Sequence, residues 1–153
     1  MNRRKASIRV RLIALILVFF IPCNIVSATE KATPRASDYI NSFNSYIYNA
    51  ALGKVQVYFH VVGVNTMDDI GALSIKIYES TDNNNWTWVK TLTNGNTPSI
   101  LGQNEIYFTS HIDYQGTIGR YYKAYVCLWA GKDGDGDTRY MWTNVVKASL
   151  FAG

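Results

Sequence analysis

Apolar and polar residues alternate along much of the chain, which is the period of a β-strand that buries one face. In the segment 54–64, apolar residues occupy every second position from Val55 to Val61. The segment 120–130 alternates in the same way, with apolar residues on one side and mostly aromatic residues on the other. Helical spacing of comparable length is absent after residue 38. We therefore expect strands at 39–48, 54–64, 73–79, 86–92, 105–109, 120–130 and 140–147.

Residues suited to tight turns separate these segments. The run Asp-Asn-Asn-Asn at 82–85 favours a hairpin because Asn and Asp tolerate positive φ and bond their own backbone. Gly95 and the glycines within 131–136 provide the same conformational freedom. About seven strands joined by such turns predict an all-β domain, built as an antiparallel β-sandwich.

The segment 119–124, Gly-Arg-Tyr-Tyr-Lys-Ala, resembles the entry to the F strand of fibronectin type III and other immunoglobulin-like domains. There a tyrosine hydroxyl ties the preceding corner to the sheet, and alternation places Tyr122 on the inward side. The resemblance implies an immunoglobulin/fibronectin type III-like sandwich in which 131–136 is the F–G loop and 65–71 the B–C loop. The immunoglobulin disulfide is missing, which favours the fibronectin-like variants.

Short motifs are also spaced over nearly all of the chain after residue 28. They are Met67-Asp68-Asp69-Ile70-Gly71-Ala72, Ile75-Lys76-Ile77-Tyr78-Glu79-Ser80, Trp86, Val89, Tyr114-Gln115-Gly116-Thr117 and Ala130-Gly131-Lys132-Asp133. This set resembles a family of small secreted proteins of Gram-positive bacteria that is described only as a domain of unknown function. The resemblance implies secretion and a single sandwich-like domain, and it implies no activity.

The first 28 residues have the features of a secretory signal peptide. A basic stretch ending at Arg11 precedes ten apolar residues at 12–21, then Pro22 and Val-Ser-Ala at 26–28. We expect a signal helix that is cleaved after Ala28, a flexible lead-in at 29–37 and the β-sandwich domain at 38–153. The alternatives are an uncleaved anchor, which Pro22 disfavours by interrupting the apolar run, and lipid attachment at Cys23, where Pro22 replaces the usual small residue.

The net charge of +4 comes from this leader, which holds five of the 15 basic residues and none of the 11 acidic ones. The ten basic residues that follow it leave a net charge near −1. We therefore expect an extracellular protein with no nucleic-acid partner and no membrane association after cleavage.

Catalytic motifs are missing from the sequence. It contains no Gly-x-Ser-x-Gly, no His-Glu-x-x-His, no phosphate-binding glycine loop and no zinc-spaced cysteine pair. We expect His60 to point outward, His111 to lie in a loop, and Cys127 to be either shielded or paired with another chain. Glu79 and Glu105 would form a carboxylate pair only by coincidence of folding. The sequence therefore predicts a protein that is not an enzyme.

Carboxylates alternate with glycines at 133–137, and two more lie in the expected B–C loop. The candidate metal ligands are Asp68, Asp69, Asp133, Asp135 and Asp137. The segment is not an EF-hand, because Thr138 occupies the glycine position and Asn144 the position of the bidentate glutamate. Two interpretations stay open: a hydrated hairpin tip without a cofactor, or a calcium site where the two loops meet.

Large rings alternate on the presumed outward side of 120–130. The candidate binding residues are Tyr78, Tyr121, Tyr125 and Trp129, with Lys76 beside them if the strand 73–79 pairs there. An outward face of rings requires cover by a loop, a partner chain or a ligand. The hairpin Ser80-Thr81-Asp82 followed by Trp86 also resembles one found in bacterial carbohydrate-associated sandwiches, although we expect Trp86 and Trp88 to pack against the hairpin.

Flat rings on a rigid sheet suit stacking against sugar rings or an extended peptide. The sequence thus predicts a secreted recognition module for a glycan or an extracellular protein. The alternative is a structural protein that self-associates through its aromatic sheet face or an edge strand. The sequence does not predict the oligomeric state.

Overall fold

The computed structural model describes residues 37–153, which form seven strands and one short 3-10 helix. The elements are β1 (Ile40–Asn49), β2 (Lys54–Ser80), β3 (Thr87–Thr93), η1 (Pro98–Ile100), β4 (Leu101–Gln115), β5 (Tyr121–Lys132), β6 (Asp135–Trp142) and β7 (Val146–Lys147). Every strand pairing is antiparallel, so the prediction of an all-β antiparallel domain of about seven strands is confirmed. The expected signal peptide, and the lead-in apart from Ser37, lie outside the described residues. Between residues 37 and 153 no helix is long and apolar enough to cross a membrane.

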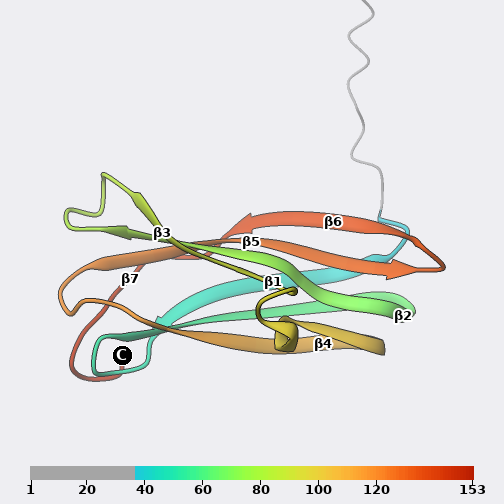
Figure 1. Cartoon of the computed structure of the whole chain (residues 1–153), viewed down its shortest axis with the longest axis horizontal. Helices are drawn as coiled ribbons and strands as arrows, with labels where there is room; N and C mark the ends of the chain where they lie inside the picture. Colours follow the sequence, from blue (N-terminus) through green and yellow to red (C-terminus); the bar gives the residue numbers. More distant parts are fainter. Residues whose placement is uncertain (1–36) are drawn as a thin grey trace, which may run out of the picture. The chain divides into compact units, whose positions relative to one another are not determined.

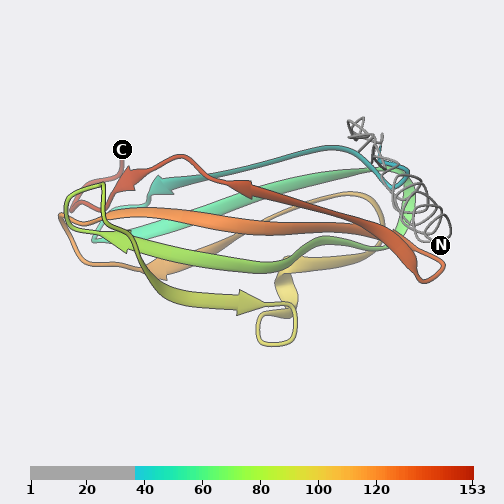
Figure 2. The same ribbon diagram turned by 90° about the horizontal axis from the view of Figure 1, so that it is seen from above.

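The long strand β2 organises the sheet, because it pairs with β1, β3, β4 and β5. Its first half lies between β1 and β4, and its second half lies between β5 and β3. Its register against β4 shifts between Val62 and Met67, and there β2 folds back on itself (Figure 1). The sheet therefore curls over into a half-barrel, with β1 and most of β4 in one layer and β3, β5 and β6 in the other. Seen from above, the long strands lie roughly along one common axis, with their arrows pointing both ways (Figure 2).

The core lies between the two layers and follows the alternation in the sequence. Val55, Val57 and Phe59 point inward from the first half of β2, and Ile75 and Ile77 point inward from its second half. The even-numbered positions of β5 from 122 to 130 are also buried in this cluster. Burying a Val, Ile or Phe side chain contributes roughly 1.5–3 kcal/mol, so these inward positions fix the faces of β2 and β5.

The expected loop at 65–71 is instead part of β2, so this part of the prediction is wrong. Met67 and Ile70 are buried, and β4 follows β2 through the bend. Two glycines permit this bend. A Cβ on Gly63 would lie 2.8 Å from the carbonyl oxygen of Asn65, and one on Gly71 would lie 2.4 Å from that of Ile100. Polar residues at a sharp bend give the same sequence pattern as a loop.

Two further strands differ from their expected bounds. β4 spans Leu101–Gln115, well beyond the expected 105–109, because its backbone pairs with β2 although most of its side chains are exposed. The expected strand 140–147 begins earlier, at Asp135, and is interrupted at Thr143, whose Oγ1 accepts a hydrogen bond from the Ala124 backbone nitrogen at 2.9 Å. The next residue, Asn144, donates to the carbonyl of Ile47 and accepts from its nitrogen, which joins the C-terminal segment to β1.

Candidate functional site

The outward side of the layer formed by β3, the second half of β2, β5 and β6 carries a set of aromatic rings. We call this surface the outer aromatic face, and it consists of Tyr78, Trp88, Tyr121, Tyr125, Trp129, Tyr140 and Trp142. The strand register places Trp88 beside Tyr78, and Trp142 beside Tyr125. Directly opposite residues in neighbouring strands share a face, so four strands contribute rings to one surface.

The centre of the outer aromatic face is a cluster of rings in mutual contact. The ring centroids of Tyr125 and Trp142 lie 4.8 Å apart, and those of Tyr78 and Trp142 lie 5.1 Å apart. Tyr140 stacks on Tyr125 at 5.9 Å with an interplanar angle of 13°. Contacts of this kind add about 0.5–1.5 kcal/mol per pair beyond area burial, so the rings hold one another in a fixed arrangement.

Lysine side chains lie among the rings. The Lys123 ammonium lies 4.2 Å from the centroid of the Trp86 ring and 4.6 Å from that of Trp142. The Lys147 ammonium lies 5.2 Å from the centroid of Tyr121. Lys76 is exposed and lies opposite Tyr125 in the register. The surface therefore combines flat apolar rings with positive charge.

Part of this surface is open to solvent. Trp88 is 58% exposed, Tyr140 60% and Trp142 48%, whereas the four rings identified from the sequence are half-buried. A shallow hollow of about 300 Å³ is lined by Lys76, Tyr78, Trp88 and Thr91. The exposure of Trp88 differs from the packing expected for it, and Trp86 packs at least in part, against the Lys123 ammonium.

The four binding residues predicted from the sequence all lie on this surface, two at its centre and one towards each end of β5. Tyr78 and Tyr125 both contact Trp142 in the centre. Tyr121 lies towards one end of β5, and Trp129 lies towards the other. At a rise of about 3.3 Å per residue, Tyr121 and Trp129 are about 26 Å apart along β5. The face is thus an extended surface rather than a compact pocket.

Sequence reasoning missed Tyr140 and Trp142, which lie on the outer aromatic face. The signal that identifies them is the two-residue turn at Asp133 and Gly134, both of which have positive φ. Such a turn fixes the register of a hairpin. Counting outward from it pairs Tyr125 with Trp142.

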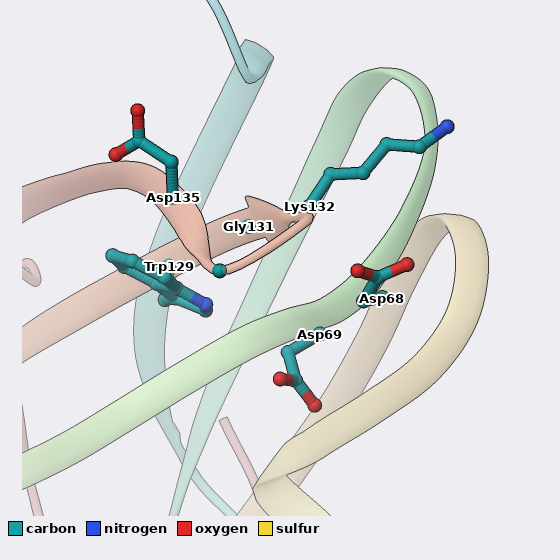
Figure 3. Close-up of a pocket in the computed structure, with 7 residues that line it drawn as sticks. Asp68, Asp69, Trp129, Gly131, Lys132 and Asp135 are labelled. Carbon is teal, nitrogen blue, oxygen red and sulfur yellow. The ribbon is translucent and has the colours of Figure 1, made fainter.

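Trp129 lies flat against the backbone at the turn between β5 and β6 (Figure 3). A Cβ on Gly131 would lie 2.5 Å from the Trp129 Cζ2 atom, and a Cβ on Gly136 would lie 2.6 Å from its Cη2 atom. Both glycines therefore make room for the indole. The ring borders a hollow of about 260 Å³ whose walls include Asp68, Asp69 and Asp135.

The carboxylates at this end do not converge. Asp68 accepts a hydrogen bond from the Asp133 backbone nitrogen at 2.7 Å, and Asp69 accepts one from the Gln103 side chain at 3.4 Å. Figure 3 shows Asp68, Asp69 and Asp135 pointing in different directions.

Asp137 is engaged elsewhere, by the Ser37 hydroxyl and the Tyr39 backbone nitrogen, and the Ser37 hydrogen bond is the main cause that lowers its pKa. Within residues 37–153 no three His, Cys, Asp or Glu side chains are grouped to hold a metal ion. The calcium site gains no support from this geometry.

Tyr122 is fully buried where β5 begins. Its hydroxyl accepts a hydrogen bond from the Thr117 backbone nitrogen at 2.8 Å and donates to the Glu79 carboxylate, which also bonds Arg120. Burial, followed by the Glu79 hydrogen bond, raises the pKa of Tyr122. The expected tie between this tyrosine and the preceding corner is therefore present.

The thiol of Cys127 and the two histidines lie in different layers. Cys127 is buried, which agrees with the shielded interpretation, and burial is the main cause that raises its pKa. His60 and His111 belong to the other layer, where Nδ1 of His60 lies 2.6 Å from the Thr109 hydroxyl. His111 is in β4 rather than in the expected loop. Cys127 and the two histidines thus lie on outward faces of opposite layers.

The carboxylates of Glu79 and Glu105 are also separated from each other. Glu79 binds Arg120 and Tyr122 near the end of β2, whereas Glu105 is exposed and pairs with Met67 near the bend. The two glutamates do not form a pair. The described geometry brings together rings and ammonium groups, not acids and nucleophiles.

Comparison with known proteins gives little further information. No family model and no curated protein matches the chain. Among solved structures, a family 76 glycoside hydrolase from a bovine Bacteroides thetaiotaomicron strain matches with a TM-score of 0.33 and 14% identity. The match covers 73% of this chain but only 20% of the hydrolase chain.

Proposed function

We propose that this protein is a secreted recognition module that binds a glycan through the outer aromatic face. The observation that carries the proposal is the cluster of Tyr78, Tyr125 and Trp142, which is partly exposed on a rigid sheet. Sugar rings present C–H faces that pack against aromatic rings, and rings already held in place lose little conformational entropy on binding. An extended surface of this kind suits a polymer better than it suits a small ligand, which binds in an enclosed pocket.

We also infer that the fold is a fibronectin type III-like sandwich. The two halves of β2 take the places of strands B and C, while β1, β4, β5 and β6 take those of A, E, F and G. The resulting layers, A-B-E and C-F-G, support this inference, as does the tie from Tyr122 to Thr117. The leader at 1–28 supports secretion, and the spaced motifs support membership of the secreted Gram-positive family.

A non-catalytic role is part of the proposal. It is supported by the separation of Cys127 from both histidines and by the engagement of Glu79 with Arg120 and Tyr122. A hydrolase screen on the purified protein checks it. Turnover that is abolished by replacing a single carboxylate would contradict it.

A glycan array tests the proposed function. The double variant Tyr125→Ala, Trp142→Ala removes the centre of the face, and the double variant Tyr46→Ala, Tyr58→Ala removes a comparable stacked pair, at 5.2 Å, from the other layer. We expect the first variant to lose binding about tenfold or more, since central aromatic contacts dominate recognition surfaces, and the second to bind like wild type. Loss in both variants, or in neither, would contradict the proposal.

Self-association is the second candidate, and the exposure of Trp88, Tyr140 and Trp142 on one face favours it. Sedimentation velocity over a range of protein concentrations separates the two. Assembly would be supported instead by two results together. Wild type would form oligomers and bind no glycan, and the Tyr125→Ala, Trp142→Ala variant would be a monomer.

A further inference from the structure

We infer that the ligand of the outer aromatic face is a polyanionic glycan, a polymer that carries carboxylate, sulfate or phosphate groups on its sugars. The inference rests on the proposed function and narrows its ligand class. It comes from the charges on this face rather than from the rings.

The centre of the face is a mixed arrangement of rings and ammonium groups. In the strand register Lys76 lies opposite Tyr125, and Lys123 lies opposite Tyr78. Each lysine therefore has a ring as its direct neighbour on the next strand. A bound polymer that lays sugar rings on the tyrosines would bring its substituents over the lysines.

These positive charges are not neutralised by neighbouring carboxylates. In the described part of the chain, the salt bridges join Lys54 to Asp113 and Arg120 to Glu79. Lys76, Lys123 and Lys147 take part in neither. The outward residues of β2 from 74 to 78, of β5 from 121 to 129 and of β6 from 138 to 142 contain no Asp or Glu.

Carboxylates lie at both ends of the layer, because exposed Asp82 is in the hairpin that follows Ser80, the residue opposite Tyr121. Asp68, Asp69 and Asp135 border the hollow beside Trp129. The end beside Trp129 therefore disfavours an anion, and Asp82 reduces the positive charge at the end near Lys147, whereas the centre with Lys76 and Lys123 favours an anion. We therefore place the charged groups of the ligand over Lys76 and Lys123 in the centre, and not over Trp129.

Two matched pairs of polymers test the inference with the whole protein. Polygalacturonate and its methyl ester share one backbone and differ in free carboxylates, and dextran sulfate and dextran differ in sulfate. Native affinity electrophoresis measures retardation of the protein in gels that contain each polymer. We expect the anionic member of at least one pair to bind about tenfold or more tightly than its neutral partner, and binding to weaken as salt shortens the Debye length from about 10 Å at 0.1 M to about 3 Å at 1 M.

Lysine substitutions test whether the attraction for anionic polymers comes from the outer aromatic face. Lys76→Gln removes an exposed ammonium group that takes part in no salt bridge among the described residues, and we expect it to weaken anionic binding about two- to fivefold. Lys54→Gln is the matched control on the other layer, and we expect wild-type retardation. Lys123→Gln is a second test, made after thermal unfolding shows that the change leaves the fold intact.

Neutral and anionic partners that bind equally, with Lys76→Gln unchanged, would overturn the inference while leaving the proposed glycan binding in place. Anionic binding that persists in the Tyr125→Ala, Trp142→Ala variant would overturn it as well, because it would show attraction of charge without the rings. An array on which no glycan binds would remove the proposed function and the inference together.

Discussion

Tyr122 joins the corner before β5 to the sheet through one hydroxyl group. The alternation in 120–130 predicted that its ring points inward, and the resemblance to an F strand implied the bond to the corner. The sequence did not predict its second partner, Glu79, because no pattern in either strand indicates that β2 and β5 place these two residues side by side.

Replacing Tyr122 by Phe keeps the ring and removes the hydroxyl. We expect the free energy of unfolding to fall by about 1–3 kcal/mol, because the Thr117 nitrogen and the Glu79 carboxylate each lose a partner. Denaturant unfolding measures the change. Tyr121→Phe is the control, and its half-buried ring should tolerate the change within about 0.5 kcal/mol. Equal losses in the two variants would show that the hydroxyl of Tyr122 has no special role.

The indole of Trp129 packs closely against Gly136, and the absence of a side chain at Gly136 leaves room for it. In Gly136→Ala the new Cβ would lie 2.6 Å from both the Ala130 carbonyl oxygen and the indole. We expect a loss of about 1–3 kcal/mol in unfolding free energy, the usual range for overpacking, and a shift in tryptophan fluorescence as the ring moves. Gly95→Ala is the control, because its Cβ would come no closer than 3.8 Å to another group. A Gly136→Ala protein as stable as Gly95→Ala would contradict the close packing.

At the scale of elements, the hairpin between β2 and β3 is organised by one carboxylate. Asp82 accepts hydrogen bonds from the backbone nitrogens of Asn85 at 2.8 Å and Asn84 at 2.9 Å, and from the side chains of Asn85 and Ser80. These bonds, those from the Asn85 and Asn84 backbones first, hold the pKa of Asp82 far below its ordinary value. The turn expected from Asp-Asn-Asn-Asn is therefore built on its acidic residue.

The stability of this hairpin should depend on pH in a defined direction. Because folding lowers the pKa of Asp82, its contribution is fully present above the unfolded pKa of about 3.9 and is lost as the pH falls towards the folded value. Hydrogen exchange of the β3 amides, compared between wild type and Asp82→Ala, measures this. We expect the largest difference in protection above pH 4 and a shrinking difference below it. A difference that grows in acid would contradict the assignment.

Strands with one buried face were predictable, and strands defined only by their backbone pairing were not. The bounds of β5 follow from alternation to within two residues, whereas β3, which has no buried residue, was placed by the polar turn before it. β4 was underestimated because its register depends on β2 and its side chains are mostly exposed. The bend of β2 was mistaken for a loop because Gly63 and the polar residues after it have loop composition.

At the scale of the whole domain, residues 37–153 present two outward faces, and the sequence pointed to one of them. Tyr125 and Trp129 were recognisable as outward rings, but Trp142 and Tyr140 were not, because their side of the sheet depends on the β5–β6 register. The other layer carries a stacked row of Tyr46, Tyr58 and His111 across β1, β2 and β4. Alternation in the sequence does not tell which of the two aromatic surfaces is the better candidate for ligand binding. The lysines between the rings distinguish the face that we assign to binding.

The most direct test of this assignment is to observe which face of the protein meets a glycan. Backbone and indole NMR resonances, followed during titration with the strongest array ligand, report contact residue by residue. We expect the largest shifts around Tyr78, Lys123, Tyr125 and the indole of Trp142. Shifts centred on Tyr46, Tyr58 and His111, or spread evenly over both layers, would contradict it.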